Sequence, residues 1–128
     1  MTGTTLLNGV SIRPFRLEQR YAYGFLLSDG RARVLIIPDE LYGWQPPAFV
    51  CDVDLAVLPS GVFETNPRTG HRRIPANHPI FDSEATFAQI LAMVEQIKPR
   101  RVYFTHIEAI DMVDHGELLG LADQLSAS

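Results

Sequence analysis

Two short apolar runs in this sequence each lead to a side chain that can ligate a metal ion. The run at residues 34–37 is followed closely by Asp39, and the run at residues 101–105 is followed directly by His106. Such runs are typical of buried strands in α/β proteins, where the carboxyl ends of the strands open onto the ligand crevice. We therefore expect a mixed α/β fold, with Asp39 and His106 as better site candidates than polar residues in loops.

The composition is that of an ordinary globular protein. Of the 128 residues, 46% are hydrophobic and 20% are charged, so we expect residues 1–128 to form a single domain with one core. The formal net charge is -4, and Lys and Arg are scattered along the chain, which gives no basic surface for a phosphate backbone. Nucleic acid is therefore not an expected partner.

Cysteine usage and hydropathy favour a cytoplasmic protein. Cys51 is the only cysteine, which excludes an internal disulfide and a Cys-x-x-Cys zinc module and suits a reducing compartment. The first residues do not combine a basic start with an apolar stretch, and the longest apolar runs are far shorter than the ~20 residues that span a bilayer. We expect neither secretion nor membrane insertion.

Pattern and turn chemistry predict four or five strands, then a helix, a strand and a second helix. Residues 9–17 roughly alternate, and Pro14, which cannot donate to a ladder, predicts that this strand lies at a sheet edge. Asp29-Gly30 separates two β-rich runs and favours a tight hairpin. The predicted strands are residues 9–17, 21–27, 32–37, 53–58 and 101–105.

A helix is predicted before the last strand, with Asp82 or Ser83 as its N-cap and Lys98-Pro99 at its end. The segments at residues 41–49 and 61–79 are rich in Gly and Pro and are expected to be irregular, and the second is long enough to act as a lid. A terminal helix is predicted at residues 116–125, with three leucines facing inward: Leu118, Leu119 and Leu121.

Each strand-end candidate also has a simpler interpretation. Asp39 could cap the turn that follows its strand, or act as the phospho-acceptor of a receiver-like domain. The hairpin-rich start of the chain argues against the repeated strand-helix order of a receiver. His106 could be a metal ligand, an acid-base group, or a structural histidine bonded to a backbone carbonyl.

His78 is a third candidate because it stands just before the predicted helix, in Asn77-His78-Pro79. The positive end of the helix dipole disfavours a charged imidazole, and a neutral ring is what a metal or an oxyanion requires. The other histidines and the glutamates near the strand ends are interpreted as solvated surface groups: His71, His115, Glu40, Glu64 and Glu108.

Four segments, taken in order, carry a family resemblance: Ile36-Ile37-Pro38-Asp39, residues 54–59, Ser83-Glu84-Ala85-Thr86 and residues 101–106. They resemble the C-terminal half of a metallo-β-lactamase-fold hydrolase of the phosphodiesterase-like branch. The resemblance implies half of an αββα sandwich, with a mixed β-sheet and helices on one face. It also implies that Asp39 bridges two metal ions, that His106 completes the shell of one of them, and that His78 is a catalytic group lining the site.

The resemblance reaches from about Val10 to the C-terminus, but it covers only half of the family's fold. The family's most diagnostic signature, His-x-His-x-Asp-His, belongs to the other half, and no two histidines here have one or three residues between them. Gln19 stands where the family usually has a histidine before the hairpin. The chain is therefore interpreted either as a portion of a longer hydrolase or as a half-fold that has lost the chemistry.

The function implied by the resemblance is metal-dependent hydrolysis, usually with zinc, of a small-molecule ester or phosphodiester. The isolated chain is expected to be inactive, because catalytic zinc needs about three protein ligands and only two are identified. The alternative is a metal-free binding or assembly domain, since half of a two-sheet sandwich exposes an apolar sheet face. Its partner would be a second copy, giving a homodimer, or the missing N-terminal half.

Overall fold

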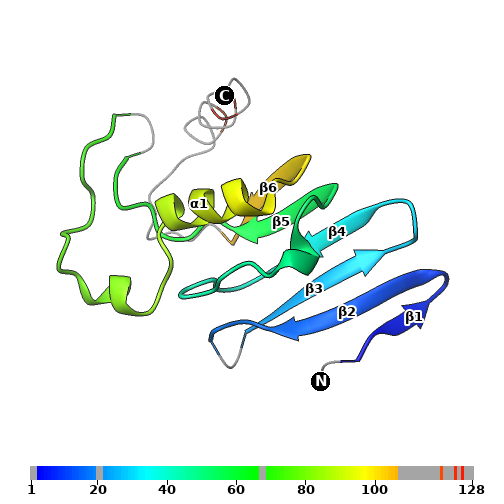
Figure 1. The fold of residues 1–128 in the computed structure, drawn as a ribbon. Helices are drawn as coiled ribbons and strands as arrows, with labels where there is room; N and C mark the ends of the chain where they lie inside the picture. The colour runs from blue at the N-terminus through cyan, green and yellow to red at the C-terminus, as the bar shows by residue number, and fades with distance from the viewer. Residues whose placement is uncertain are drawn as a thin grey trace.

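The computed structural model describes residues 3–19, 22–66, 69–106, 119, 123 and 125 of the chain. Its described strands form one six-stranded mixed sheet whose spatial order follows the sequence (Figure 1). The first four strands pair antiparallel, and the last three pair parallel. The prediction of a mixed α/β fold is confirmed. The strands are β1 Thr5–Leu7, β2 Val10–Arg16, β3 Tyr23–Ser28, β4 Arg33–Ile36, β5 Leu55–Pro59 and β6 Arg101–Thr105.

The predicted hairpin connects β3 and β4. Gly30 has a φ of 89°, and the Asp29 carboxylate accepts hydrogen bonds from the amides of Arg31 at 2.8 Å and Ala32 at 2.9 Å. These two bonds, the one from Ala32 first, lower the pKa of Asp29. The turn residues therefore fix this hairpin locally, as the sequence indicates.

A second hairpin, which was not predicted, places β1 beside β2. Asn8 and Gly9 form its two-residue turn with φ values of 50° and 80°, and Leu7 pairs with Val10. The prediction that residues 9–17 form an edge strand is therefore wrong for the first part of β2. Pro14 lies beyond the three residues of β2 that pair with β1, so its missing N–H breaks no bond of that pairing.

The helix α1, Phe87–Ile97, begins later than predicted. Its N-cap is Thr86, whose hydroxyl accepts a hydrogen bond from the amide of Gln89, while the Gln89 side chain accepts one from the amide of Thr86. Ser83 instead ends a short 3-10 helix, η2, at Pro79–Asp82, so the predicted caps Asp82 and Ser83 are wrong. At the other end, Lys98 takes the left-handed conformation, as expected of a helix stopped by Pro99.

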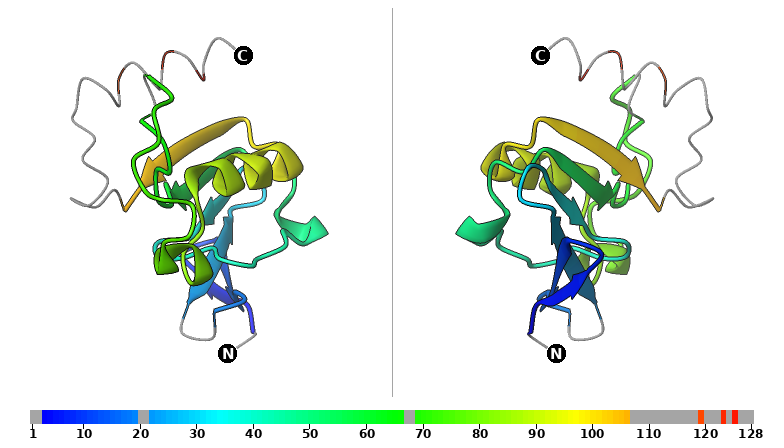
Figure 2. Two further views of the ribbon diagram at one scale, coloured as in Figure 1. Left: turned by 90° about the vertical axis from the view of Figure 1, so that its left-hand side faces the viewer. Right: turned by 90° about the vertical axis from the view of Figure 1, so that its right-hand side faces the viewer.

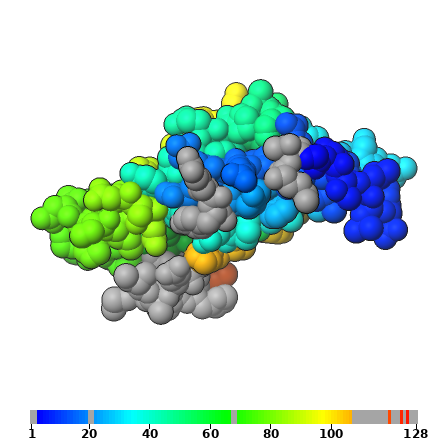
Figure 3. Space-filling view, turned by 90° about the horizontal axis from the view of Figure 1, so that it is seen from below, coloured from blue at the N-terminus to red at the C-terminus, as the bar shows by residue number. Residues whose placement is uncertain are grey.

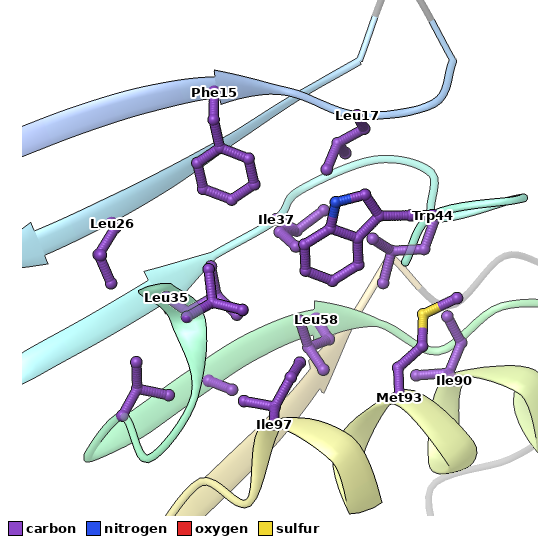
Figure 4. Packing of buried hydrophobic residues seen from close by; sticks show 14 of the residues in the cluster. Phe15, Leu17, Leu26, Leu35, Ile37, Trp44, Leu58, Ile90, Met93 and Ile97 are labelled. Atoms are coloured by element: carbon purple, nitrogen blue, oxygen red, sulfur yellow. The ribbon is translucent and has the colours of Figure 1, made fainter. Parts of the chain in front are cut away.

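The core lies between the sheet and α1. Ile90, Met93 and Ile97 of α1 pack toward Leu35 and Leu58 of the sheet (Figure 4). The irregular segment between β4 and β5, with the 3-10 helix η1 at Ala48–Val50, closes the core beside α1. Its contributions include three residues with little or no exposure: Leu41, Trp44 and Val50.

The sheet face away from α1, here called the open face, is largely apolar, and it also carries Arg16, Arg101 and Thr105. The strand registers place Phe25 and Leu27 of β3 on the same face as Ile36, Val57 and the neighbouring apolar residues of β2 and β5. Most of these side chains are partly exposed, and Tyr103 of β6 is 57% exposed. Figure 2 shows α1 and η1 on the opposite side of the sheet. The predicted arrangement of a sheet with a helix on one face is confirmed.

Two parts of the described chain project from the rest of the molecule. In Figure 3 the β1–β2 hairpin projects at one end of the molecule and the segment at residues 61–79 at the other. Within the described residues, no helix is long and apolar enough to cross a membrane. The predicted terminal helix falls mostly outside the described residues. Leu119 is helical, but it is 55% exposed, so its predicted inward orientation is wrong.

Candidate metal site at the carboxyl edge of the sheet

Asp39 and His106 meet at the carboxyl edge of the parallel strands. β4 and β6 flank β5, and each delivers its candidate just beyond its last residue. The Asp39 Oδ1 and His106 Nε2 atoms are 3.8 Å apart, and the side chains are 55% and 44% exposed. The structure thus brings together two side chains that are 67 residues apart in the sequence, and it leaves both accessible to a ligand.

Backbone contacts on both strands fix the positions of this pair. On the β4 side, the Ile37 amide donates to the carbonyl of Val57 at 2.8 Å, two residues before Asp39. On the β6 side, the carbonyl of Thr105 accepts from the amide of Ser60 at 2.9 Å. His106 itself has a φ of 56°, a left-handed conformation that costs a residue with a Cβ about 1–3 kcal/mol. Such strain is concentrated at functional sites, and here it sets the direction in which β6 presents the imidazole.

The simpler interpretation of Asp39, as the cap of the following turn, does not fit the contacts. The turn amide of Tyr42 donates to the carboxylate of Glu40 instead. Glu40 Oε2 also accepts a hydrogen bond from the amide of Ala85 at 3.0 Å. The turn is therefore capped by the neighbouring glutamate, and the Asp39 carboxylate is left to face His106.

Glu40 is a buried residue, which the sequence interpretation missed. It is 9% exposed, whereas we expected a solvated surface carboxylate. Burial raises its pKa above the ordinary value and the charge of Asp39 acts in the same direction, while hydrogen bonds from the amides of Ala85, Tyr42 and Leu41 lower it. The carboxylate joins the end of β4 to the start of α1 across 45 residues of sequence.

His78 lies in a different local setting from the one that was expected. It is the N-cap of η2, not of α1, and its Nδ1 accepts a hydrogen bond from the amide of Ile80 at 3.1 Å. This bond requires an unprotonated Nδ1, in keeping with the expected neutral ring. No contact with Asp39 is shown for His78 in the described part of the chain, so its role in the site stays a prediction.

The other candidates are dispersed. His71 is exposed in the loop at residues 61–79, where Glu64 pairs with Arg72 at 3.8 Å. Gln19 lies in the turn between β2 and β3, where its carbonyl accepts from the amide of Ala22 at 2.9 Å. Glu108 and His115 fall outside the described residues.

The pair fits a metal ion as two ligands of an incomplete shell. Carboxylate and imidazole ligands of tetrahedral zinc lie roughly 3.4 Å from each other, given metal–ligand distances of about 2.1 Å. The observed 3.8 Å is close to this value, and both donors are of the types that zinc prefers. Within the described ranges, no group of three or more His, Cys, Asp or Glu side chains is gathered around a common point.

Comparison with known proteins identifies the fold. No protein-family model and no curated protein sequence matches the chain. Among solved structures, the metallo-beta-lactamase fold protein YhfI from Bacillus subtilis matches 95% of this chain, with a TM-score of 0.58 and 15% sequence identity. Zn(2+)-bound PqqB from Methylobacterium extorquens matches 96% of the chain, with a TM-score of 0.58 and 17% identity.

Both matches cover nearly all of this chain but only part of the other protein. The chain spans 46% of the length of each of the two solved structures. The fold of this chain thus corresponds to about half of the fold of each of these larger proteins. This chain has the fold of one half of a metallo-β-lactamase-fold protein.

Proposed function

We propose that this chain is the C-terminal portion of a metal-dependent hydrolase, in which Asp39 and His106 ligate a divalent metal ion. The observation that carries the proposal is the 3.8 Å approach of a carboxylate and an imidazole at the carboxyl edge of a sheet with this fold. Zinc is the first candidate, because it accepts this pair of ligand types and because the similar PqqB structure is zinc-bound.

The chain supplies only part of the ligand shell. Catalytic zinc is typically held by three protein ligands with one open position, and the described residues offer two. The remaining ligands would come from the half of the fold that the chain does not cover. We therefore expect weak metal binding and no hydrolysis by this chain alone.

The roles of the residues follow from their positions. A bound metal would supply an acidified water and would polarise the carbonyl or phosphoryl group of a small-molecule ester or phosphodiester. Asp39 and His106 would fix the ion at the end of β4 and β6. His78, in the loop that follows β5, is proposed as a group lining the site, where the Nε2–H of its neutral imidazole could donate a hydrogen bond, since Nδ1 already accepts from the amide of Ile80.

Zinc binding by the purified chain tests this proposal. Competition with a chromogenic chelator would measure the zinc dissociation constant of the wild type, Asp39→Ala and His106→Ala, with His71→Ala as a control for an exposed histidine elsewhere. We expect each ligand substitution to weaken binding at least tenfold and the control to bind like the wild type. Absence of measurable zinc binding by the wild type, or equal binding by all four proteins, would contradict the proposal.

The open face favours a second candidate function, a metal-free assembly domain. Apolar sheet faces are normally packed against a second layer, and two sheets stack about 10 Å apart in sandwich folds. We propose that a second copy of this chain can occupy the open face and give a two-fold homodimer. The other possible occupant is the half of the fold that the chain does not cover.

The sedimentation of two variants, Leu27→Glu and Leu6→Glu, compared with the wild type tests the assembly function. Leu27 lies on the open face, whereas Leu6 of β1 is 73% exposed and lies on the side of the sheet that faces α1. We expect Leu27→Glu to be a monomer at concentrations where the wild type and Leu6→Glu are dimers. A monomeric wild type at micromolar concentration would rule out the homodimer.

A further inference from the structure

The buried carboxylate of Glu40 has a feature that a simple turn cap lacks. Its Oε2 atom accepts hydrogen bonds from two backbone amides that are 43 residues apart, those of Tyr42 and Ala85. Burying a carboxylate costs free energy that its hydrogen bonds must offset, and the partners of Glu40 in the described part of the chain are backbone amides, not a cationic side chain. The contact therefore links the segment at Tyr42 to the segment at Ala85 at a cost in free energy.

The second segment is held by backbone hydrogen bonds to the residues that follow β5. Ala85 immediately precedes the N-cap Thr86, and its carbonyl accepts a hydrogen bond from the amide of Val62 at 2.9 Å. The amide of Phe87 donates to the carbonyl of Val62 at 2.8 Å. A Cβ on Gly61 would lie only 2.6 Å from the Ala85 oxygen, so the segment that follows β5 and the start of α1 are in direct backbone contact. Glu40 is thus attached to a rigid point.

The first segment, in contrast, has few backbone hydrogen bonds around Asp39, although Ile37 and Leu41 on either side are buried in the core. The last strand-like hydrogen bond after β4 is that of the Ile37 amide, and Pro38 has no N–H to donate. Asp39 follows directly, and its side chain is more than half exposed. Asp39 is therefore held between the sheet at Ile37 and the buried carboxylate at Glu40.

We propose that Glu40 is the positioning residue of the candidate metal site: by tying the end of β4 to the start of α1, it holds the Asp39 carboxylate opposite His106. The predicted effect of Glu40 on metal affinity rests on the proposed function. The restraint that Glu40 places on Asp39, in contrast, does not require a bound metal. Residues that orient metal ligands typically change metal affinity by about 10- to 100-fold when they are removed.

The test compares Glu40→Ala, Glu40→Gln and Val50→Ala in the full chain. Glu40→Gln keeps a side-chain oxygen that can accept from both amides. Val50→Ala is the control for lost stability, because Val50 is fully buried in η1, near the amino end of β4. Amide exchange at Tyr42 and Ala85 and the NMR order parameter of the Asp39 amide are measured without metal, and the zinc dissociation constant is measured separately.

We expect Glu40→Ala to lower the Asp39 order parameter from ~0.85 toward ~0.6 and to speed exchange at both amides. Zinc binding should weaken about 10- to 100-fold. Glu40→Gln should restore both properties, and Val50→Ala should leave them unchanged. An Asp39 that stays ordered in Glu40→Ala, or that loosens equally in Val50→Ala, would overturn the inference. If the wild type binds no zinc, the metal function fails, and the order parameters still decide the role of Glu40.

Discussion

Gly61→Ala is a sharp test of the packing between the segment that follows β5 and the start of α1. Gly61 has a φ of 69°, and a Cβ there would lie 2.6 Å from the oxygen of Ala85 and 2.9 Å from the carbonyl carbon of Thr86. Both distances are well inside the roughly 3.5 Å of an ordinary contact. The neighbouring atoms belong to the backbone, so no side-chain rotation can make room.

The expected loss of stability has two parts. A left-handed φ costs an alanine about 1–2 kcal/mol, and overpacking of a close contact costs about 1–3 kcal/mol. The sum of about 2–5 kcal/mol is a large share of the roughly 6–19 kcal/mol expected for a domain of this length. It corresponds to a fall in Tm of roughly 8–20 °C.

Gly70→Ala separates the two parts. Gly70 has a similar φ of 73°, but nothing lies within 4 Å of an added Cβ, so this variant has the conformational cost alone. Urea unfolding followed by circular dichroism would give the free energy of unfolding of both variants. Gly61→Ala should be less stable than Gly70→Ala by about 1–3 kcal/mol. Equal stability of the two variants would refute the close contact between Gly61 and the start of α1.

Two further predictions concern Glu40 and the start of α1. Because the pKa of Glu40 is raised in the folded state, the folded chain binds its proton more tightly than the unfolded chain. Its contribution to stability is therefore complete below the ordinary value of 4.5 and is lost as the pH rises through the folded-state pKa. Urea unfolding between pH 4 and pH 7 should show that the free energy of unfolding falls with rising pH, and that it falls less in Glu40→Gln than in the wild type. The same pH dependence in both proteins would show that Glu40 does not titrate in this way. Thr86→Ala should lower the free energy of unfolding by about 1 kcal/mol, because the capping box is lost. Thr86→Ser should recover most of this loss in the same assay. An unchanged free energy of unfolding in Thr86→Ala would mean that packing alone sets the start of the helix.

Features that depend on neighbouring residues in the sequence were predictable. The β3–β4 hairpin follows from Asp29-Gly30, because positive φ and a side-chain acceptor favour the turn wherever it occurs. The β1–β2 hairpin has the same kind of signal in Asn8-Gly9, a pair that favours a further strand before residue 10 and so an inner position for the start of β2. The spacing of apolar residues likewise predicted the helix, and Lys98-Pro99 predicted its end.

The start of α1 shows where local signals are insufficient. Asp82, Ser83 and Thr86 are all suitable N-cap residues, and the sequence offers no means of choosing among them. The choice is made by the backbone pairing of Val62 with Thr86, which keeps the chain extended up to the cap. This pairing joins segments 24 residues apart.

The sequence alone determined that Asp39 and His106 each stand at the end of a strand, because apolar runs and their boundaries are local properties. The tertiary structure alone decided that the two side chains meet, since β4 and β6 must both pair in parallel with β5 to bring their ends to one edge. It also decided that Glu40 is buried while Asp39 remains exposed. Strand pairing and burial depend on contacts between distant segments, and a local pattern carries no information on which segments those are.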